Sequence, residues 1–76
     1  MKNEDIKIGR CYLIEIDKQF VKGIVTSKAR KTSRGWVLVD VDFINCSYYG
    51  MTFCAFYTHR FRRELSKEEV IMEMLD

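Results

Sequence analysis

The sequence predicts a mainly β fold: four or five strongly bent antiparallel strands in a small barrel, followed by a C-terminal α-helix. Three observations support this fold class. Apolar and polar side chains alternate in several short runs, which is the pattern of half-buried strands. The runs are joined by short polar segments of the kind found in hairpins. Beyond residue 64 the apolar spacing becomes helical, which predicts a single terminal helix.

The first two expected strands cover residues 10–16 and 20–27, with a polar turn at 17–19. A glycine inside a strand marks a bulge, a bend or a close approach of another backbone. We therefore expect Gly23 to let the second strand bend around the barrel. In the first strand Tyr12, Ile14 and Ile16 share one face, and in the second Val21, Gly23 and Val25 share one face.

Residues 36–44 show the most regular alternation in the chain and predict the third strand. The fourth, 51–57, has aromatic or apolar residues on both faces, which indicates a central or covered strand. A fifth short strand is expected at 59–63. The inward face of the third strand is expected to carry Val37, Val39, Val41 and Phe43.

The C-terminal helix is expected over about residues 66–75 of a single domain spanning 1–76. Ser66 and Glu69 have the spacing of a capping box, and Leu65 and Val70 have that of a hydrophobic staple. A helix of this length does not persist alone and must dock. Its apolar stripe either covers an open end of the barrel, packs across a homodimer interface or enters a groove on a partner.

Two segments carry a resemblance to a known architecture. They are Val21-Lys22-Gly23-Ile24-Val25, with its internal glycine, and Gly35-Trp36-Val37-Leu38-Val39. Together with the short polar turns, they resemble an SH3-like barrel, and Tudor and KOW-type domains are the nearest versions. The resemblance covers about residues 8–63. It implies a small bent barrel with a binding role, in a class whose ligands are RNA, DNA or protein.

Charge is distributed unevenly along the chain. Residues 1–63 carry 12 Lys and Arg against 6 Asp and Glu, a net charge of +6, whereas residues 64–76 carry 1 against 5, a net charge of −4; together these give the overall +2. A basic body with an acidic terminal segment fits a polyanion-binding surface or a self-complementary charge pattern.

The expected binding surface is the basic loop at residues 28–34 together with the chain's one tryptophan. Cations on a loop tip contact phosphates, and an exposed indole offers a face on which an unstacked base can lie. The alternative for the loop is a solvated hairpin tip. For Trp36 we favour partial burial as a cap on the core over a stacking platform, although one indole can do both. Tyr48 and Tyr49 offer further aromatic faces. The expected nucleic-acid-binding residues are Lys28, Arg30, Lys31, Arg34 and Trp36, with Arg60, Arg62 and Arg63 as a second phosphate patch.

Other residue types indicate no catalysis and no cofactor. The three cysteines and His59 lack the closely spaced ligand pair typical of structural zinc sites, so we expect no metal. No activated nucleophile or paired-carboxylate motif accompanies the single histidine. The odd number of cysteines and the absence of an apolar N-terminal run favour a cytoplasmic protein with free thiols. No apolar run approaches the length of a membrane span, so no membrane partner is expected.

These observations favour a non-catalytic binding module that binds nucleic acid, either RNA or DNA, through the basic hairpin loop. The alternative is a protein-interaction module, namely an adaptor or a small inhibitor of a host factor of the phage or mobile-element type. In that case the basic loop faces an acidic protein surface. A homodimer is compatible with both.

Overall fold

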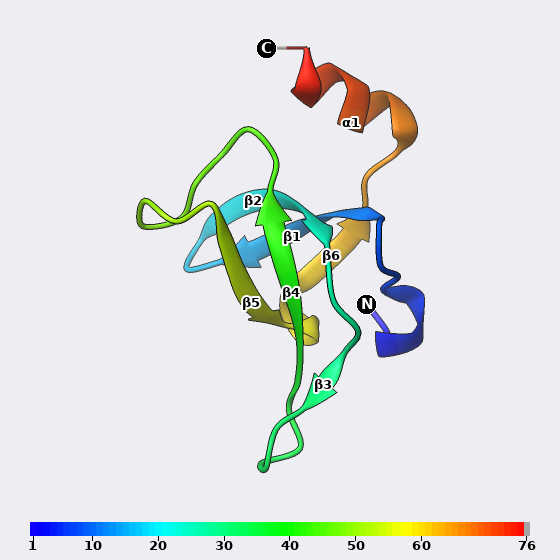
Figure 1. Ribbon diagram of the computed structural model, residues 1–76, viewed down its shortest axis with the longest axis vertical. Helices are drawn as coiled ribbons and strands as arrows, with labels where there is room; N and C mark the ends of the chain where they lie inside the picture. The colour runs from blue at the N-terminus through cyan, green and yellow to red at the C-terminus, as the bar shows by residue number, and fades with distance from the viewer. Residues whose placement is uncertain (76) are drawn as a thin grey trace.

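Strands in the computed structural model, which describes residues 1–75, form one antiparallel sheet that curls into a half-barrel, and an α-helix follows the last strand (Figure 1). The strands are β1 (Cys11–Ile16), β2 (Gln19–Val25), β3 (Arg30–Lys31), β4 (Val37–Phe43), β5 (Phe53–Tyr57) and β6 (Phe61–Glu64). The helices are α1 (Lys67–Met74) and two 3-10 turns, η1 (Asn3–Asp5) and η2 (Thr58–Arg60). The predicted fold class is confirmed. The sixth strand is β3, a two-residue piece of the basic segment that the sequence indicated as a loop.

The strand order is β3-β4-β2-β1-β6, and β5 pairs with β4. β4 makes the most pairings in the sheet, because it pairs with β2, β3 and β5. Residues 41–43 pair with β2, residues 37–38 pair with β3, and residues 38–42 pair with β5. All of these pairings are antiparallel. β2 and β3 therefore lie one after the other along β4, like two parts of one strongly bent strand.

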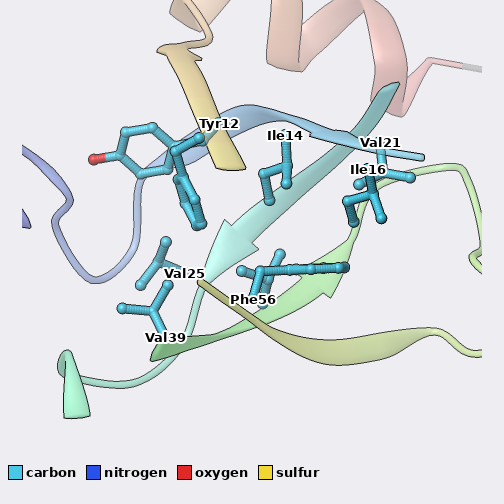
Figure 2. Close-up of a cluster of buried hydrophobic side chains, with 9 residues drawn as sticks. Tyr12, Ile14, Ile16, Val21, Val25, Val39 and Phe56 are labelled. Atoms are coloured by element: carbon cyan, nitrogen blue, oxygen red, sulfur yellow. The ribbon is translucent and has the colours of Figure 1, made fainter. Parts of the chain in front are cut away.

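The core lies inside the curl of the sheet and is built from the predicted inward faces (Figure 2). The Tyr12 ring packs against Phe61 with ring centroids 5.4 Å apart. Its hydroxyl donates to the Asp5 carbonyl at 3.0 Å and accepts from the Lys7 amide at 2.8 Å, so the buried phenol is hydrogen-bonded. The buried core residues are Tyr12, Ile14, Ile16, Val21, Val25, Val39, Val41, Phe56 and Phe61. In β1, β2 and β4, the face that lines the core is thus one of the two faces that the alternation separated.

Gly23 lies where β2 is held between β1 and β4, paired with Tyr12 on one side and Phe43 on the other. A Cβ at this position would meet a Val41 methyl at 2.1 Å and the Asp42 carbonyl oxygen at 2.9 Å. Only glycine allows the strands to come this close without moving backbone. Gly23 was predicted to provide a bend, and what the structure shows at this position is a close approach to β4.

Helix α1 begins as predicted. The Ser66 hydroxyl accepts from the Glu69 amide at 3.2 Å, and the Glu69 carboxylate accepts from the Ser66 amide at 2.9 Å. The helix docks on the outer face of β1 and β2 through Val70, in a second apolar cluster with Cys11, Ile44 and Leu65. The apolar side chains left exposed on α1 are Ile71, Met72, Met74 and Leu75.

The prediction that the fourth strand is central or covered was wrong. Within residues 1–75, β5 pairs only with β4 and forms an edge of the sheet. Cys54 and Phe56 pack toward the core, whereas the Phe53 side chain is 69% exposed on the outer face. The outer face carries Phe53, Ala55 and Tyr57, so both faces of this edge strand are apolar or aromatic.

Candidate functional site

The β3–β4 hairpin projects from one end of the molecule, and α1 lies at the opposite end of the longest axis (Figure 1). The hairpin is closed locally. The Thr32 amide donates to the Trp36 carbonyl at 2.7 Å, and the Trp36 amide donates to the Thr32 hydroxyl at 3.1 Å. Gly35 has a φ of +85°, a left-handed conformation that glycine adopts without strain. Local turn chemistry therefore holds the basic residues at an exposed tip.

One of the predicted basic residues of the hairpin, Arg30, forms an ion pair with Asp40 of the neighbouring strand. The Arg30 guanidinium donates two parallel hydrogen bonds to the Asp40 carboxylate, at 2.8 Å and 3.0 Å. The same hydrogen bonds lower the pKa of Asp40 below its ordinary value. Arg30 therefore serves to fix the hairpin against β4, and its charge is largely balanced in place.

Three other predicted residues remain available, and we call Lys28, Lys31 and Arg34 the hairpin cations. All three are exposed. No ion pair within residues 1–75 involves any of them, whereas five other basic side chains are paired with acids. The tip thus carries three positive charges that are free to attract an anion from solution.

Beside the hairpin, three rings gather on the outer face of the sheet. We call Trp36, Tyr57 and His59 the aromatic cluster. The Trp36 ring centroid lies 5.6 Å from that of Tyr57 and 5.2 Å from that of His59, and the Tyr57 and His59 rings are stacked 13° from parallel. Trp36 is 50% exposed and Tyr57 is 38% exposed. The cluster is therefore an open aromatic surface held in place by ring contacts.

The cluster forms because of sheet register. Trp36 immediately precedes β4, and Leu38 stands opposite Tyr57 in the β4–β5 ladder. The η2 turn directly after Tyr57 then brings His59 back over the same face. Lys31 pairs with Val37, the residue after Trp36, so the hairpin cations and the aromatic cluster share one end of the sheet.

The second predicted basic patch differs from the first. Arg62 donates to Glu15 at 2.8 Å and to the His59 carbonyl at 2.9 Å. Arg63 donates two hydrogen bonds of 2.8 Å to Glu69, and this pair, with the Ser66 amide, lowers the pKa of Glu69 to about 2. These two arginines join β6 to β1 and to α1. Arg60 is half-buried and has no ion pair in the described part of the chain.

Sequence reasoning missed Tyr57 and His59 as parts of the surface. Their convergence on Trp36 depends on the β4–β5 register, which the alternation within residues 51–57 does not specify. The tyrosines that were indicated lie elsewhere. Tyr48 packs near the core and donates to Asp17 at 2.8 Å, which raises the pKa of Tyr48 to about 12, and Tyr49 rests against it, 81% exposed.

The remaining chemistry of residues 1–75 can be stated briefly. No three His, Cys, Asp or Glu side chains in that range are grouped so that they could hold a metal ion, and no pocket is found there. Cys11, Cys46 and Cys54 are free thiols, and burial raises the pKa of Cys11. None of the helices in the described range has the length and apolar character to cross a bilayer.

Comparison with protein-family models, with curated proteins and with solved structures found no match for this chain.

Proposed function

We propose that this protein is a non-catalytic module that binds single-stranded nucleic acid, RNA or DNA, at the end of the sheet formed by the hairpin cations and the aromatic cluster. The observation that carries the proposal is their juxtaposition: three cations with no acidic partner among residues 1–75 share one end of the sheet with a half-exposed tryptophan. Phosphates bind the cations while a base lies on the indole face. A cytoplasmic location is part of the proposal and fits the three free thiols.

The two kinds of contact make separable contributions to affinity. Each phosphate contact releases counterions, so three contacts on a single strand predict a slope of log affinity against log salt of about −2. Stacking of one base on an aromatic ring contributes about 1–3 kcal/mol and depends little on salt or sequence. Binding is therefore expected to be salt-sensitive, with a residual component from the aromatic surface.

The preference for a single strand follows from the exposed ring faces. Bases in a duplex already stack on their neighbours and present only their edges in the grooves. An unpaired base can leave its stack and lie against an aromatic ring. The hairpin cations alone would attract both forms, so the aromatic cluster is the part of the site that distinguishes them.

The test is fluorescence anisotropy with labelled single- and double-stranded DNA and RNA, titrated from low to physiological salt. The variant Lys31→Ala/Arg34→Ala removes two hairpin cations. The matched control Lys18→Asn/Lys67→Ala removes the same charge from the β1–β2 turn and the start of α1. We expect the wild type to bind single strands more tightly than double strands. We expect only the hairpin variant to bind with lower affinity and with a smaller dependence of affinity on salt. Equal losses in both variants, or no binding at low salt, would contradict it.

A second candidate function is protein interaction, as an adaptor or as a small inhibitor of a host factor. It is favoured by the four apolar side chains that α1 leaves exposed, which suit a contact with another protein. The hairpin cations would then face an acidic protein surface. In this case the anisotropy titration gives no nucleic-acid binding at low salt, and apolar substitutions on α1 rather than hairpin substitutions abolish partner binding.

A further inference from the structure

The open edge of β5 has an unusual composition for an edge strand. Within residues 1–75 this strand pairs on one side only, with β4, and its sequence FCAFY contains no charged residue. The other two edge strands carry charged side chains: β3 consists of Arg30 and Lys31, and β6 has the sequence FRRE, in which Arg62 and Arg63 are exposed. Charged side chains are the usual protection of an edge against pairing with another strand. β3 and β6 have this protection and β5 lacks it.

The ladder alternation tells which backbone groups face the open edge. The Phe43 amide donates to the Thr52 carbonyl at 2.9 Å, on the β5 side of β4, and the Thr26 amide donates to the Asp40 carbonyl at 2.9 Å, on the other side. Hydrogen-bonded pairs in an antiparallel ladder alternate. Cys54 and Phe56 therefore bond to β4. The N–H groups of Phe53, Ala55 and Tyr57 point away from β4, as do the carbonyls of Phe53 and Ala55.

We propose that β5 pairs with β5 of a second copy of this chain, antiparallel about a twofold axis at Ala55. The five-residue strand reads as aromatic, small, aromatic in both directions along its outer face. In this register Ala55 faces Ala55 of the partner subunit, and Phe53 faces Tyr57 of the partner subunit. Small side chains meet at the axis, aromatic side chains meet across the strands, and no like charges are opposed.

The second copy is the occupant favoured by this self-complementarity. The same residues supply the outward-facing backbone donors and acceptors on both sides, as a closed twofold interface requires; the Ala55 carbonyl meets only the weak Cys54 thiol donor at 3.5 Å among residues 1–75. The Phe53 side chain, which is 69% exposed in the monomer, obtains a partner. Because Tyr57 belongs to the aromatic cluster, the cluster of one protomer continues into Phe53 of the partner subunit. Pairing of β5 with β5 of the second copy needs no nucleic acid, so its test is independent of the test of the proposed function.

The experiment is sedimentation velocity of the ligand-free protein from micromolar to millimolar concentration, on wild type and two variants. Ala55→Pro removes an N–H at the open edge without removing a bond to β4, a position where an edge strand tolerates proline. Ala55→Ser keeps the N–H and serves as the matched control. We expect wild type and Ala55→Ser to rise to twice the monomer mass, and Ala55→Pro to stay monomeric.

Amide hydrogen exchange on the wild type provides a readout that does not depend on a variant. On concentration the amides of Phe53, Ala55 and Tyr57 are expected to slow, whereas those of Cys54 and Phe56, already bonded to β4, stay unchanged. A wild type that is monomeric throughout overturns the proposal. So does a dimer that persists in a folded Ala55→Pro protein. If Ala55→Pro does not fold, unchanged exchange at the three wild-type amides overturns it.

Discussion

The two basic segments, residues 28–34 and 60–63, have similar composition and different surroundings. In the hairpin, only Arg30 meets an acid, and Lys28, Lys31 and Arg34 remain exposed and without ion pairs among residues 1–75. In the second segment, two of three arginines are bound to acids. The hairpin is thus a surface that offers charge to a ligand, whereas the β6 arginines hold the sheet and α1 together.

The difference arises from what lies across each strand. β6 runs beside β1, which carries Glu15, and leads into α1, which carries Glu69. β3 runs beside only the first two residues of β4, and a turn without acids follows it. A count of basic residues therefore overstates the charge available for binding, and the neighbours in space determine how much remains.

The largest expected effect comes from neutralising each set of cations in turn. Lys28→Gln/Lys31→Gln/Arg34→Gln should weaken binding of a single strand by ~100-fold or more at low salt and remove most of the salt slope. The matched triple Arg10→Gln/Lys22→Gln/Arg63→Gln removes the same charge from ion-paired side chains. It should change affinity by less than ~3-fold, because surface ion pairs leave little charge for a ligand. Anisotropy measures both, and similar losses would remove the distinction between the hairpin cations and the ion-paired side chains.

The next effect separates stacking from charge. Trp36→Ala should weaken binding by about 10-fold or more, because one stacked base contributes about 1–3 kcal/mol, while the salt slope stays as in wild type. Tyr49→Ala is the control, since that ring is exposed outside the aromatic cluster. Trp36 is the only tryptophan, so its fluorescence reports stacking directly in the wild type. Unquenched Trp36 emission on saturation would argue against a stacked base.

A smaller effect concerns the ion pair that attaches α1. The folded-state pKa of Glu69, about 2, lies below its ordinary 4.5, so the charged carboxylate stabilises the docked helix. This contribution is complete above pH 4.5 and is lost as the pH falls from 4.5 to 2. Far-ultraviolet circular dichroism and the α1 amide resonances should show loosening in this range. Glu69→Gln should lack this pH dependence. A Glu69 carboxyl that titrates at its ordinary value would contradict the ion pair.

The smallest effect on affinity is expected from removing the Arg30–Asp40 ion pair within the hairpin. Arg30→Gln/Asp40→Asn removes both partners and leaves the net charge unchanged, so affinity should stay within ~2-fold of wild type. Arg30→Gln alone should weaken binding more, because it leaves the Asp40 carboxylate unbalanced beside the site. A double-mutant cycle by anisotropy measures the coupling. A double variant as weak as Arg30→Gln alone would mean that Arg30 contacts the ligand itself.

The parts of the fold that depend on local pattern were predictable. Alternation located β1, β2 and β4 and their inward faces, and the Ser66 and Glu69 spacing located the start of α1. The edge position of β5 was not predictable from the sequence. Apolar residues on both faces suit a central strand as well as an edge strand with an aromatic outer surface.

The candidate site was predictable only in part. Its basic loop and tryptophan lie in one short stretch of sequence, whereas the ion pairs and ring contacts around them join residues far apart in the sequence. The basic loop and Trp36 follow from sequence. The pairing of Arg62 with Glu15 joins residues 47 apart, and Tyr57 reaches Trp36 only through the β4–β5 register. Such contacts depend on which strands become neighbours, and no alternation pattern encodes that.

The most direct test of the proposed binding surface is an amide chemical-shift titration of the isotope-labelled protein with a short single-stranded oligonucleotide. We expect the shifts to concentrate at residues 28–36 and 57–59, with β6 beyond Phe61 and α1 little affected. Shifts that concentrate at Arg62, Arg63 and α1 and spare the hairpin would contradict it, because the ion-paired arginines would then be the ones that bind.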